Sequence, residues 1–415
     1  MIAQNSKAAN QCEDIFFDQR TTRPQNDINK ADSELKNLVK AKNPSKTIRS
    51  SAGHFWRRTK DIIKNLTSSS LNNSQLTILD RLMSIDGWVI CDLHNGNLSP
   101  MRLAVTEKNL LGKIDYAVVD YDDPAPQGPL IFDIIHHIIA AKAVEVPSNT
   151  KISKEDIFEA YLRGLKGKDF TTPPRINKIL TMSPAEFRLL EIKKAKKFTD
   201  ADGKSLVKDG IRSTQISEAE YQEVFINLKN AVGRQYEILD IGGREKDSGG
   251  SADALRYLAL LKEIETGDQF LFELKQEATS AVTEFQEQPH YDYNDRLDHY
   301  VHMNYPRDIR FQSIVIHIAG KKVGMTLRPK PLYFFDYAND GSKNSAYKEF
   351  RDLTMFNAYW LGQKQRRDDS SNAQSLLSTI KAIGPDVVFD CIKALTRELN
   401  QFYDDQSREY RHSQK

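Results

Sequence analysis

The order in which helix-like and strand-like segments follow one another constrains the fold most strongly. Apolar residues recur at helical spacing on both sides of a long stretch that is typical of strands. That stretch, residues 236–337, consists of short alternating or β-branched runs separated by glycine or aspartate, with one expected helix near 278–287. The other expected helices cover residues 54–66, 76–84, 131–144, 155–165, 217–231, 347–366 and 385–403. The chain therefore predicts an α+β fold in separate blocks: helices, a mostly antiparallel sheet, then helices again.

Composition divides the chain further. The first 48 residues are rich in Asn, Lys, Gln, Asp and Ser and predict a flexible arm. Prolines, a KKAKK run and the polar patch TDADGK predict a linker or mobile insertion beginning at residue 166. The predicted units are an arm (1–48), a helical lobe with strand-like runs at 88–91 and 114–122 (49–165), a linker or insertion (166–233), a β-rich lobe (234–337), more helices (338–405) and a tail (406–415).

The overall charge and cysteine usage exclude several classes of protein. With 59 basic and 57 acidic residues the net charge is +2, so nothing indicates a nucleic-acid partner. Cys12, Cys91 and Cys391 are too far apart for a CxxC pair and favour a reducing compartment. No apolar run approaches the roughly 20 residues of a membrane span, and the polar start is not a Sec signal. We expect a cytoplasmic protein, with export by a non-Sec route left open.

The segment GWVICDLHNGNLSP, residues 87–100, carries the first candidate chemistry. Asp92, His94 and Asn97 follow an apolar run directly. Such residues can be plain turn chemistry, because Asp, Asn and Gly gather where strands end. Equally, a carboxylate beside a carboxamide can accept a hydroxyl proton and hold a metal ion. The motif alone leaves both interpretations open.

A second acidic motif ends the next strand-like run. Asp120 closes the apolar segment IDYAVVD and would project into the same crevice as Asp92, unless the loop is merely a solvated acidic turn. Mg²⁺ bound to nucleotide phosphates takes one or two carboxylates plus water, so Asp120 and Asn97 would suffice. Asp133 lies within an apolar helix, where an unpaired carboxylate costs several kcal/mol. We interpret Asp133 as a structural brace for the loop at Asp92 rather than a ligand.

The third motif is a glycine-bearing loop between strands, with a lysine on the strand that follows. Backbone N–H groups of Gly249, Gly250 and Ser251 can approach phosphate oxygens because little side chain blocks them. Lys275, in the run FLFELK, would reach a crevice and needs an anionic partner there. Alternatively, these glycines form an ordinary hairpin turn between two strands and bind no phosphate.

Taken together, these segments resemble a known group of proteins. WVICDLHNGN is similar to the catalytic loop of aminoglycoside phosphotransferases and other small-molecule kinases. The closer resemblance is to the bacterial domain-of-unknown-function family 2252, which has a kinase-like fold. The matching segments are Phe55-Trp56-Arg57, Asp92-Leu93-His94-Asn95-Gly96-Asn97, Asp120-Tyr121-Asp122-Asp123, Gly250-Ser251 with Arg256-Tyr257, and Lys275 with Ser280. They occur in family order, and the resemblance weakens after about residue 290.

The resemblance implies a protein-kinase-like bilobal fold in circular permutation. The catalytic loop precedes the glycine loop here, whereas ordinary kinases have the opposite order. Residues 166–233 would bridge the usual termini, and 338–405 would complete the helical lobe. By the same resemblance, Asp92 is the catalytic base, Asn97 and Asp120 bind Mg²⁺, and Gly249, Gly250, Ser251 and Lys275 bind the phosphates of ATP. His94 would brace the loop, while His136 and His137 are expected to be ordinary helix residues.

Some residues depart from the family pattern. Cys91 stands where glycine is usual, Ser248 and Asp253 replace loop glycines, and Gln276 replaces the acidic residue after the lysine. A lysine–glutamate pair would then use Glu277 or Glu284.

Three functions remain open at this stage. The first is ATP- and Mg²⁺-dependent phosphoryl transfer to a hydroxyl of an unidentified small molecule or protein. The second is a catalytically silent nucleotide-binding module. The third is a two-metal phosphoesterase, a class that also begins with D-x-H but needs further motifs, G-N-H-D/E and G-H-x-H, which the sequence lacks. The sequence indicates neither the acceptor nor the oligomeric state.

Overall fold

A computed structural model describes most of the chain after residue 51. The described residues are 52–64, 71–121, 124–142, 152–244, 255–277, 280, 282, 296–303, 306–318, 321–332 and 344–413. The predicted arm, the glycines and serine at 249–251, and nearly all of the helix expected near 278–287 lie outside them.

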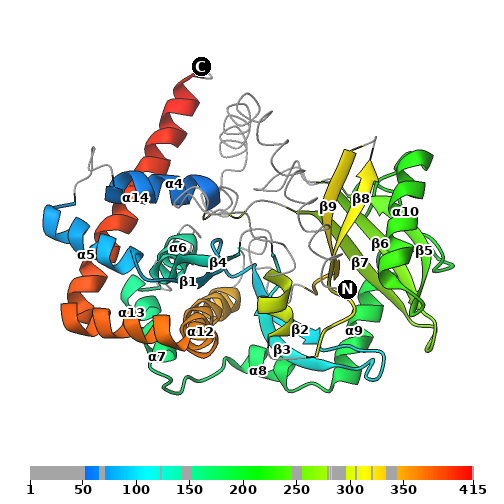
Figure 1. The fold of residues 1–415 in the computed structure, drawn as a ribbon, viewed down its shortest axis with the longest axis horizontal. Coiled ribbons are helices and arrows are strands. Elements are labelled where there is room, and N and C mark those ends of the chain that lie inside the picture. The colour runs from blue at the N-terminus through cyan, green and yellow to red at the C-terminus, as the bar shows by residue number, and fades with distance from the viewer. Residues whose placement is uncertain are drawn as a thin grey trace, which may run out of the picture.

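Helices from both ends of the chain form one lobe, on the left in Figure 1. They are α4 (Ala52–Lys64), α5 (Asn73–Met83), α6 (Leu130–Lys142), α7 (Lys154–Leu165), α12 (Asn344–Asp368), α13 (Ser370–Ile383) and α14 (Pro385–Ser413). Helix α6 is its centre, because every residue from Leu130 to Ala141 is buried. A helix that is buried on all sides belongs to a core rather than to a surface.

Two glycines let α7 and α12 approach closely. A Cβ atom added at Gly164 would lie 2.1 Å from the carbonyl oxygen of Tyr359, and one at Gly362 would lie 2.3 Å from that of Tyr161. Any side chain at either position would push the helices apart. The C-terminal segment is thereby held against the N-terminal part of the same lobe, although about 200 residues separate them in sequence.

Two short antiparallel ribbons extend the helical lobe. Strand β1 (Asp86–Val89) pairs with β4 (Ala125–Pro129), and β2 (Leu98–Leu103) pairs with β3 (Lys113–Val118). The sequence predicted β1 and β3 but only loops between and after them. The reason is composition: β2 reads LSPMRL and β4 reads APQGP, so proline and glycine mask the apolar pattern of both.

The predicted antiparallel sheet is confirmed. Its strands are β5 (Tyr236–Gly243), β6 (Arg256–Glu263), β7 (Gln269–Gln276), β8 (Gln312–Ile318) and β9 (Lys321–Pro329). They lie in the order β5-β6-β7-β9-β8, and every neighbouring pair is antiparallel. A π-helical turn, η3 (Asp298–His302), precedes β8 and was not predicted.

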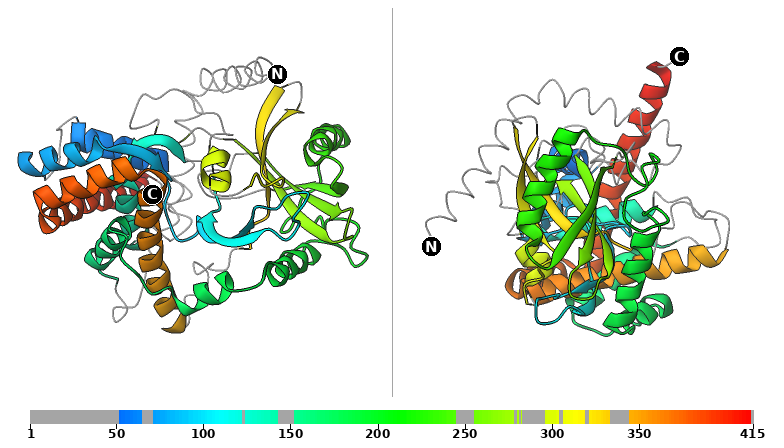
Figure 2. Two further views of the ribbon diagram at one scale, coloured as in Figure 1. Left: turned by 60° about the horizontal axis from the view of Figure 1, so that its bottom comes forward. Right: turned by 90° about the vertical axis from the view of Figure 1, so that its right-hand side faces the viewer.

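The two faces of the sheet are covered differently. On the outer face, α10 (Glu218–Val232) lies across the sheet, as Figure 2 shows. Its Val224 and Leu228 pack against Phe272 and other apolar residues of the sheet. On the opposite face, here called the inner face, α9 (Pro184–Lys196) covers a smaller apolar patch. Because side chains alternate along a strand, Glu273 and Lys275 lie on the inner face, away from α10.

The segment expected to be a linker or mobile insertion, residues 166–215, is partly helical. It contains α8 (Pro174–Leu180) and α9, and α10 follows. The prolines that suggested a linker stand at the first turn of α8 and α9, where the missing N–H costs nothing. Ser183 and Glu186 add a capping box to α9.

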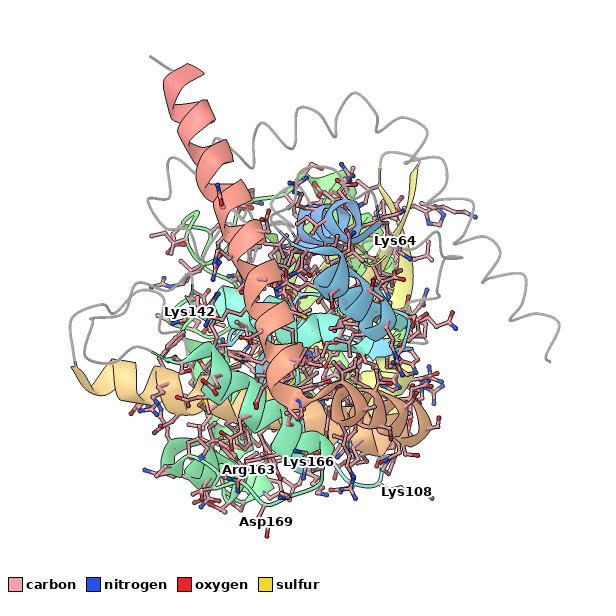
Figure 3. The ribbon with its side chains drawn as sticks, turned by 90° about the vertical axis from the view of Figure 1, so that its left-hand side faces the viewer. Lys64, Lys108, Lys142, Arg163, Lys166 and Asp169 are labelled. Carbon is pink, nitrogen blue, oxygen red and sulfur yellow. The ribbon has the colours of Figure 1, made fainter. Side chains whose placement is uncertain are left out.

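The C-terminal block has three helices rather than the two expected. Helix α13 was not predicted because its start is rich in Ser, Asn and Gln. Its buried face consists of Ala373, Leu376 and Ile380. Figure 3 shows α14 crossing the outside of the helical lobe, above the end of α7 marked by Arg163 and Lys166. No helix in the described part of the chain is long and apolar enough to span a bilayer.

Candidate functional site

Asp133 holds the loop that follows β1. Its two carboxylate oxygens accept hydrogen bonds from the backbone N–H groups of Ile90 and Cys91, both at 2.8 Å. Burial raises the pKa of Asp133 to about 7, although these two hydrogen bonds act in the opposite direction. The brace expected from sequence is confirmed, and it acts on the two residues directly before Asp92.

Cys91 has a backbone conformation that favours glycine. Its φ is +65° and its side chain is fully buried. Left-handed backbone costs roughly 1–2 kcal/mol for a residue with a Cβ. A glycine would adopt this conformation without that cost.

This strain makes a testable prediction. We expect Cys91→Gly to keep the free energy of unfolding within about 1 kcal/mol of the wild-type value, because relief of strain offsets the lost packing of the thiol. Cys91→Val should be less stable than Cys91→Gly by about 1–3 kcal/mol, since a β-branched side chain fits this backbone worst. Urea unfolding of both variants measures the difference, and equal stabilities would contradict it.

Polar groups surround the buried carboxylate of Asp92. The side-chain amide of Asn97 donates to the backbone oxygen of Asp92 at 2.8 Å and to its Oδ2 at 3.3 Å. His94 Nε2 lies 3.6 Å from Oδ2, and His136 Nε2 lies 3.6 Å from Oδ1. His94 Nδ1 accepts the N–H of Gly96, which matches its expected bracing role.

His136 also contacts the carboxylate of Asp92. It was expected to be an ordinary helix residue, but it faces Asp92 and its Nδ1 donates to the carbonyl oxygen of Leu93 at 3.1 Å. Its position three residues after Asp133 on α6 was the available signal, because residues at that spacing share a helix face. His137, by contrast, donates to the carbonyl oxygen of Thr354 on α12.

The β2–β3 hairpin brings Asn97 and Asp120 to the same end. Leu98 pairs with Val118, and the N–H of Val119 donates to the carbonyl oxygen of Asn97 at 2.9 Å. Asn97 stands directly before β2 and Asp120 stands just after β3, so both lie at the same end of the hairpin. Because the amide nitrogen of Asn97 points to Asp92, its Oδ1 is the end that can face a cation.

Lys275 reaches this hairpin from the sheet. Its Nζ lies 2.7 Å from Asp120 Oδ1, and its side chain is only 1% exposed. Arg328 Nη1 is 3.6 Å from the same oxygen and also donates to the carbonyl oxygen of Val119. Burial lowers the pKa of Lys275 to about 8, although the negative charges of Asp120 and, more weakly, Asp92 oppose the shift. Segments 155 residues apart thus meet at one point.

Neighbouring positive charges determine the pKa of Asp120. Burial alone would raise its pKa, but the positive charges of Lys275 and Arg328 outweigh burial and hold the pKa well below its usual range. Its side chain is still 32% exposed. An ionised, partly accessible carboxylate and an amide oxygen, from residues at the same end of one hairpin, are oxygen donors of the kind that suits Mg²⁺. Among the described residues, no group of three or more His, Cys, Asp and Glu side chains could hold a metal ion.

Of the two glutamates expected as partners of Lys275, the structure describes only Glu277. Glu277 accepts a hydrogen bond from Ser313 on β8 and lies against Gly324, while Glu284 is outside the described residues. The fully buried glutamate on the inner face is Glu273, two residues before Lys275, and it pairs with Arg328 and Lys330. Glu273 shares the face of Lys275 because side chains alternate along a strand, and its partners on β9 are 55 and 57 residues away in sequence.

Comparison with known proteins identifies no relative. No protein-family model, no curated protein and no solved structure matches this chain.

Proposed function

We propose that the protein is an ATP- and Mg²⁺-dependent phosphotransferase that acts on a hydroxyl group, with a circularly permuted kinase-like fold. The observation that carries the proposal is the 2.7 Å contact between Lys275 and Asp120, beside the loop of Asp92 and Asn97. A lysine from a sheet, a carboxylate at a strand end and a catalytic loop with Asp and Asn are the recurring parts of phosphoryl-transfer sites.

In this proposal Asn97 Oδ1 and Asp120 hold Mg²⁺, and Lys275 turns from Asp120 to the nucleotide phosphates. When bound, Mg²⁺ would neutralise part of the charge on the phosphate oxygens. Breaking the Lys275–Asp120 ion pair would cost little free energy when the ligands bind. Asp120 would exchange the ammonium group for Mg²⁺, and Lys275 would exchange the carboxylate for a phosphate group. The ion pair is thus the resting state of the site.

Asp92 takes the proton of the acceptor hydroxyl. As that oxygen bonds to the γ-phosphorus, the bond from the γ-phosphorus to the bridging oxygen breaks and the nucleoside diphosphate leaves. His94 and Asn97 keep the Asp92 carboxylate oriented through its Oδ2. Asp133 supports the same loop from behind.

The direct test is transfer of label from γ-labelled ATP with Mg²⁺, first to the protein itself and then to candidate hydroxyl compounds. The proposal expects label transfer by the wild type and its loss in Asp92→Ala and Asp120→Ala. ATP binding without transfer or hydrolysis would instead support the silent nucleotide-binding module.

Lys275 supplies a further prediction. Lys275→Met should weaken nucleotide binding at least about tenfold, equivalent to about 1.4 kcal/mol, because the phosphates lose a charged partner. Lys275→Arg keeps the charge and should retain more of the affinity. Isothermal titration with ATP and Mg²⁺ measures both, with circular dichroism to show that the variants are folded. An unchanged dissociation constant in Lys275→Met would remove the lysine from the site.

A further inference from the structure

Helix α4 packs against both the loop that carries Asp92 and the histidine that faces it. The indole nitrogen of Trp56 donates to the carbonyl oxygen of Cys91 at 3.0 Å. The ring of Phe55 packs edge to face against the imidazole of His136, with ring centroids 4.9 Å apart. Phe55 and Trp56, from the first segment of the resemblance, therefore hold His136 and the loop in fixed positions.

The hydrogen bond of His136 determines its tautomer. Its Nδ1 lies 3.1 Å from the carbonyl oxygen of Leu93, which can only accept a hydrogen bond, so Nδ1 carries the proton. His136 is fully buried, and burial lowers its pKa, although the negative charge of Asp92 opposes the shift. The resting imidazole is therefore neutral, with a lone pair on Nε2.

That lone pair faces the carboxylate of the proposed base. Nε2 lies 3.6 Å from Asp92 Oδ1, which is too far for a hydrogen bond, and it has no hydrogen-bond partner among the described residues. A neutral Nε2 and a carboxylate oxygen are both acceptors, so they can bond to each other only through an added proton. Buried polar atoms are nearly always hydrogen-bonded, so an unpartnered nitrogen aimed at Asp92 indicates a role in the chemistry.

The other oxygen of Asp92 faces donors instead. Asn97 donates to Oδ2 at 3.3 Å. His94 accepts the N–H of Gly96 at its Nδ1, so its neutral ring carries the proton on Nε2, which lies 3.6 Å from Oδ2. The two sides of the carboxylate therefore differ, and a proton that arrives on Asp92 finds an acceptor on the side of His136.

We infer that His136 receives the proton that Asp92 takes from the acceptor hydroxyl. The inference rests on the proposed function, because that reaction supplies the proton. The O–H bond of the acceptor breaks as an O–H bond forms on Asp92, and this bond breaks in turn as an N–H bond forms at Nε2 of His136.

The product of this step is a buried ion pair. The imidazolium of His136 donates from Nδ1 to Leu93 and from Nε2 to the carboxylate of Asp92, so both of its N–H groups have acceptors. The proton returns through Asp92 to water after the products leave. His136 acts through Asp92 rather than on the acceptor itself.

Two substitutions separate proton transfer from simple orientation of Asp92. In His136→Asn the amide nitrogen can replace Nδ1 and keep the hydrogen bond to Leu93, while nothing replaces Nε2. In His136→Gln the amide nitrogen can replace Nε2 and donate to Asp92, but it cannot accept a proton.

The measurement is single-turnover transfer of label from γ-labelled ATP with Mg²⁺, to the protein itself or to water. We expect both His136 variants to transfer label at least about tenfold more slowly than the wild type, with ATP affinity within about threefold of the wild-type value. A wild-type rate in His136→Gln beside a slow His136→Asn would show that the histidine only orients Asp92, and would overturn the inference.

His137→Gln is the matched control. His137 is the next residue of α6 and is also buried, but its Nε2 donates to the carbonyl oxygen of Thr354. Glutamine can keep that donor, so the rate should stay within about threefold of the wild-type rate. A loss as large as that in His136→Gln would reflect a general disturbance of α6 and would contradict the inference.

Nitrogen NMR of the full-length protein, labelled in its histidine rings, tests the resting state without any change to His136. Near neutral pH we expect a neutral ring with the proton on Nδ1 and none on Nε2. Asp92→Asn places an amide N–H opposite Nε2, so the signal of that nitrogen should shift as a hydrogen bond forms. An imidazolium, or a neutral ring with its proton on Nε2, in the resting wild type would overturn the inference.

The outcomes separate this inference from the proposed function. Equal rates of label transfer in the wild type and in both His136 variants would overturn the inference and leave the function standing. A wild type that transfers no label would overturn the function, and the inference would fall with it.

Discussion

Replacing Asp92 with asparagine should lower phosphoryl transfer from ATP by about 10²–10⁴-fold while leaving ATP binding nearly unchanged. A positioned base contributes an effect of that size, and an amide cannot accept the hydroxyl proton. Asparagine keeps the size of the side chain and an oxygen, so the contacts with His94 and Asn97 lose little of their geometry. Initial rates and titration of ATP with Mg²⁺ measure the two quantities separately.

The matched control is Asn95→Asp, which makes the reverse exchange, amide to acid, in the same loop. Asn95 contacts Thr354 and Asn357 of α12 rather than Asp92. We expect its rate to fall much less than that of Asp92→Asn. If both variants transfer label at similar rates, Asp92 is not the base.

Asp133→Ala should be among the most destabilising single changes in the helical lobe. It leaves the buried N–H groups of Ile90 and Cys91 without their acceptor, and each such loss costs about 1–3 kcal/mol. The expected decrease in the free energy of unfolding is therefore about 2–6 kcal/mol, read from urea denaturation. Asp133→Asn, which keeps one acceptor, should fall between the alanine variant and the wild type.

The pH dependence of Asp133 adds an independent check. Its pKa is raised to about 7 in the folded protein from about 3.9 in an unfolded chain, so between these values the folded state binds the proton more tightly. Its contribution to stability is thus greatest at low pH and is lost as the pH rises through 7. Relative to Asp133→Asn, the wild type should gain stability between pH 8 and pH 5. A constant difference would contradict the raised pKa.

Much of the fold could be predicted because its signals are local. The apolar spacing of α6 and the alternating strands β5 to β9 indicate their structures within each segment. The helices and strands that were not predicted share one cause. Proline, serine and glycine can interrupt a helix or strand, but they can also stand at its start or within it. Pro174 and Pro184 begin helices rather than interrupting them, and Pro100 lies within a buried strand. Tertiary contacts decide which of these roles such a residue takes, and the local sequence pattern carries no information on those contacts.

The candidate site divides in the same way. Asp92, Asn97, Asp120 and Lys275 stand at strand ends or in a strand, so their residue types and positions were readable, and three segments meet as expected. The contacts of His136 with Asp92 and of Arg328 with Asp120 were not readable, because they join elements 44 and 208 residues apart in sequence. The positive φ of Cys91 was not readable either, because cysteine has no preference for left-handed backbone.

The central claim is that Asp120 and Lys275 bind a metal and a triphosphate at one place. Its most direct test is the affinity for ATP, measured by calorimetry with Mg²⁺ and again with EDTA, in the wild type and in Asp120→Asn. We predict that Mg²⁺ strengthens binding by at least about tenfold in the wild type. In Asp120→Asn, most of that gain should disappear. ATP affinity that is the same with and without Mg²⁺, or a gain that Asp120→Asn leaves intact, would contradict the account.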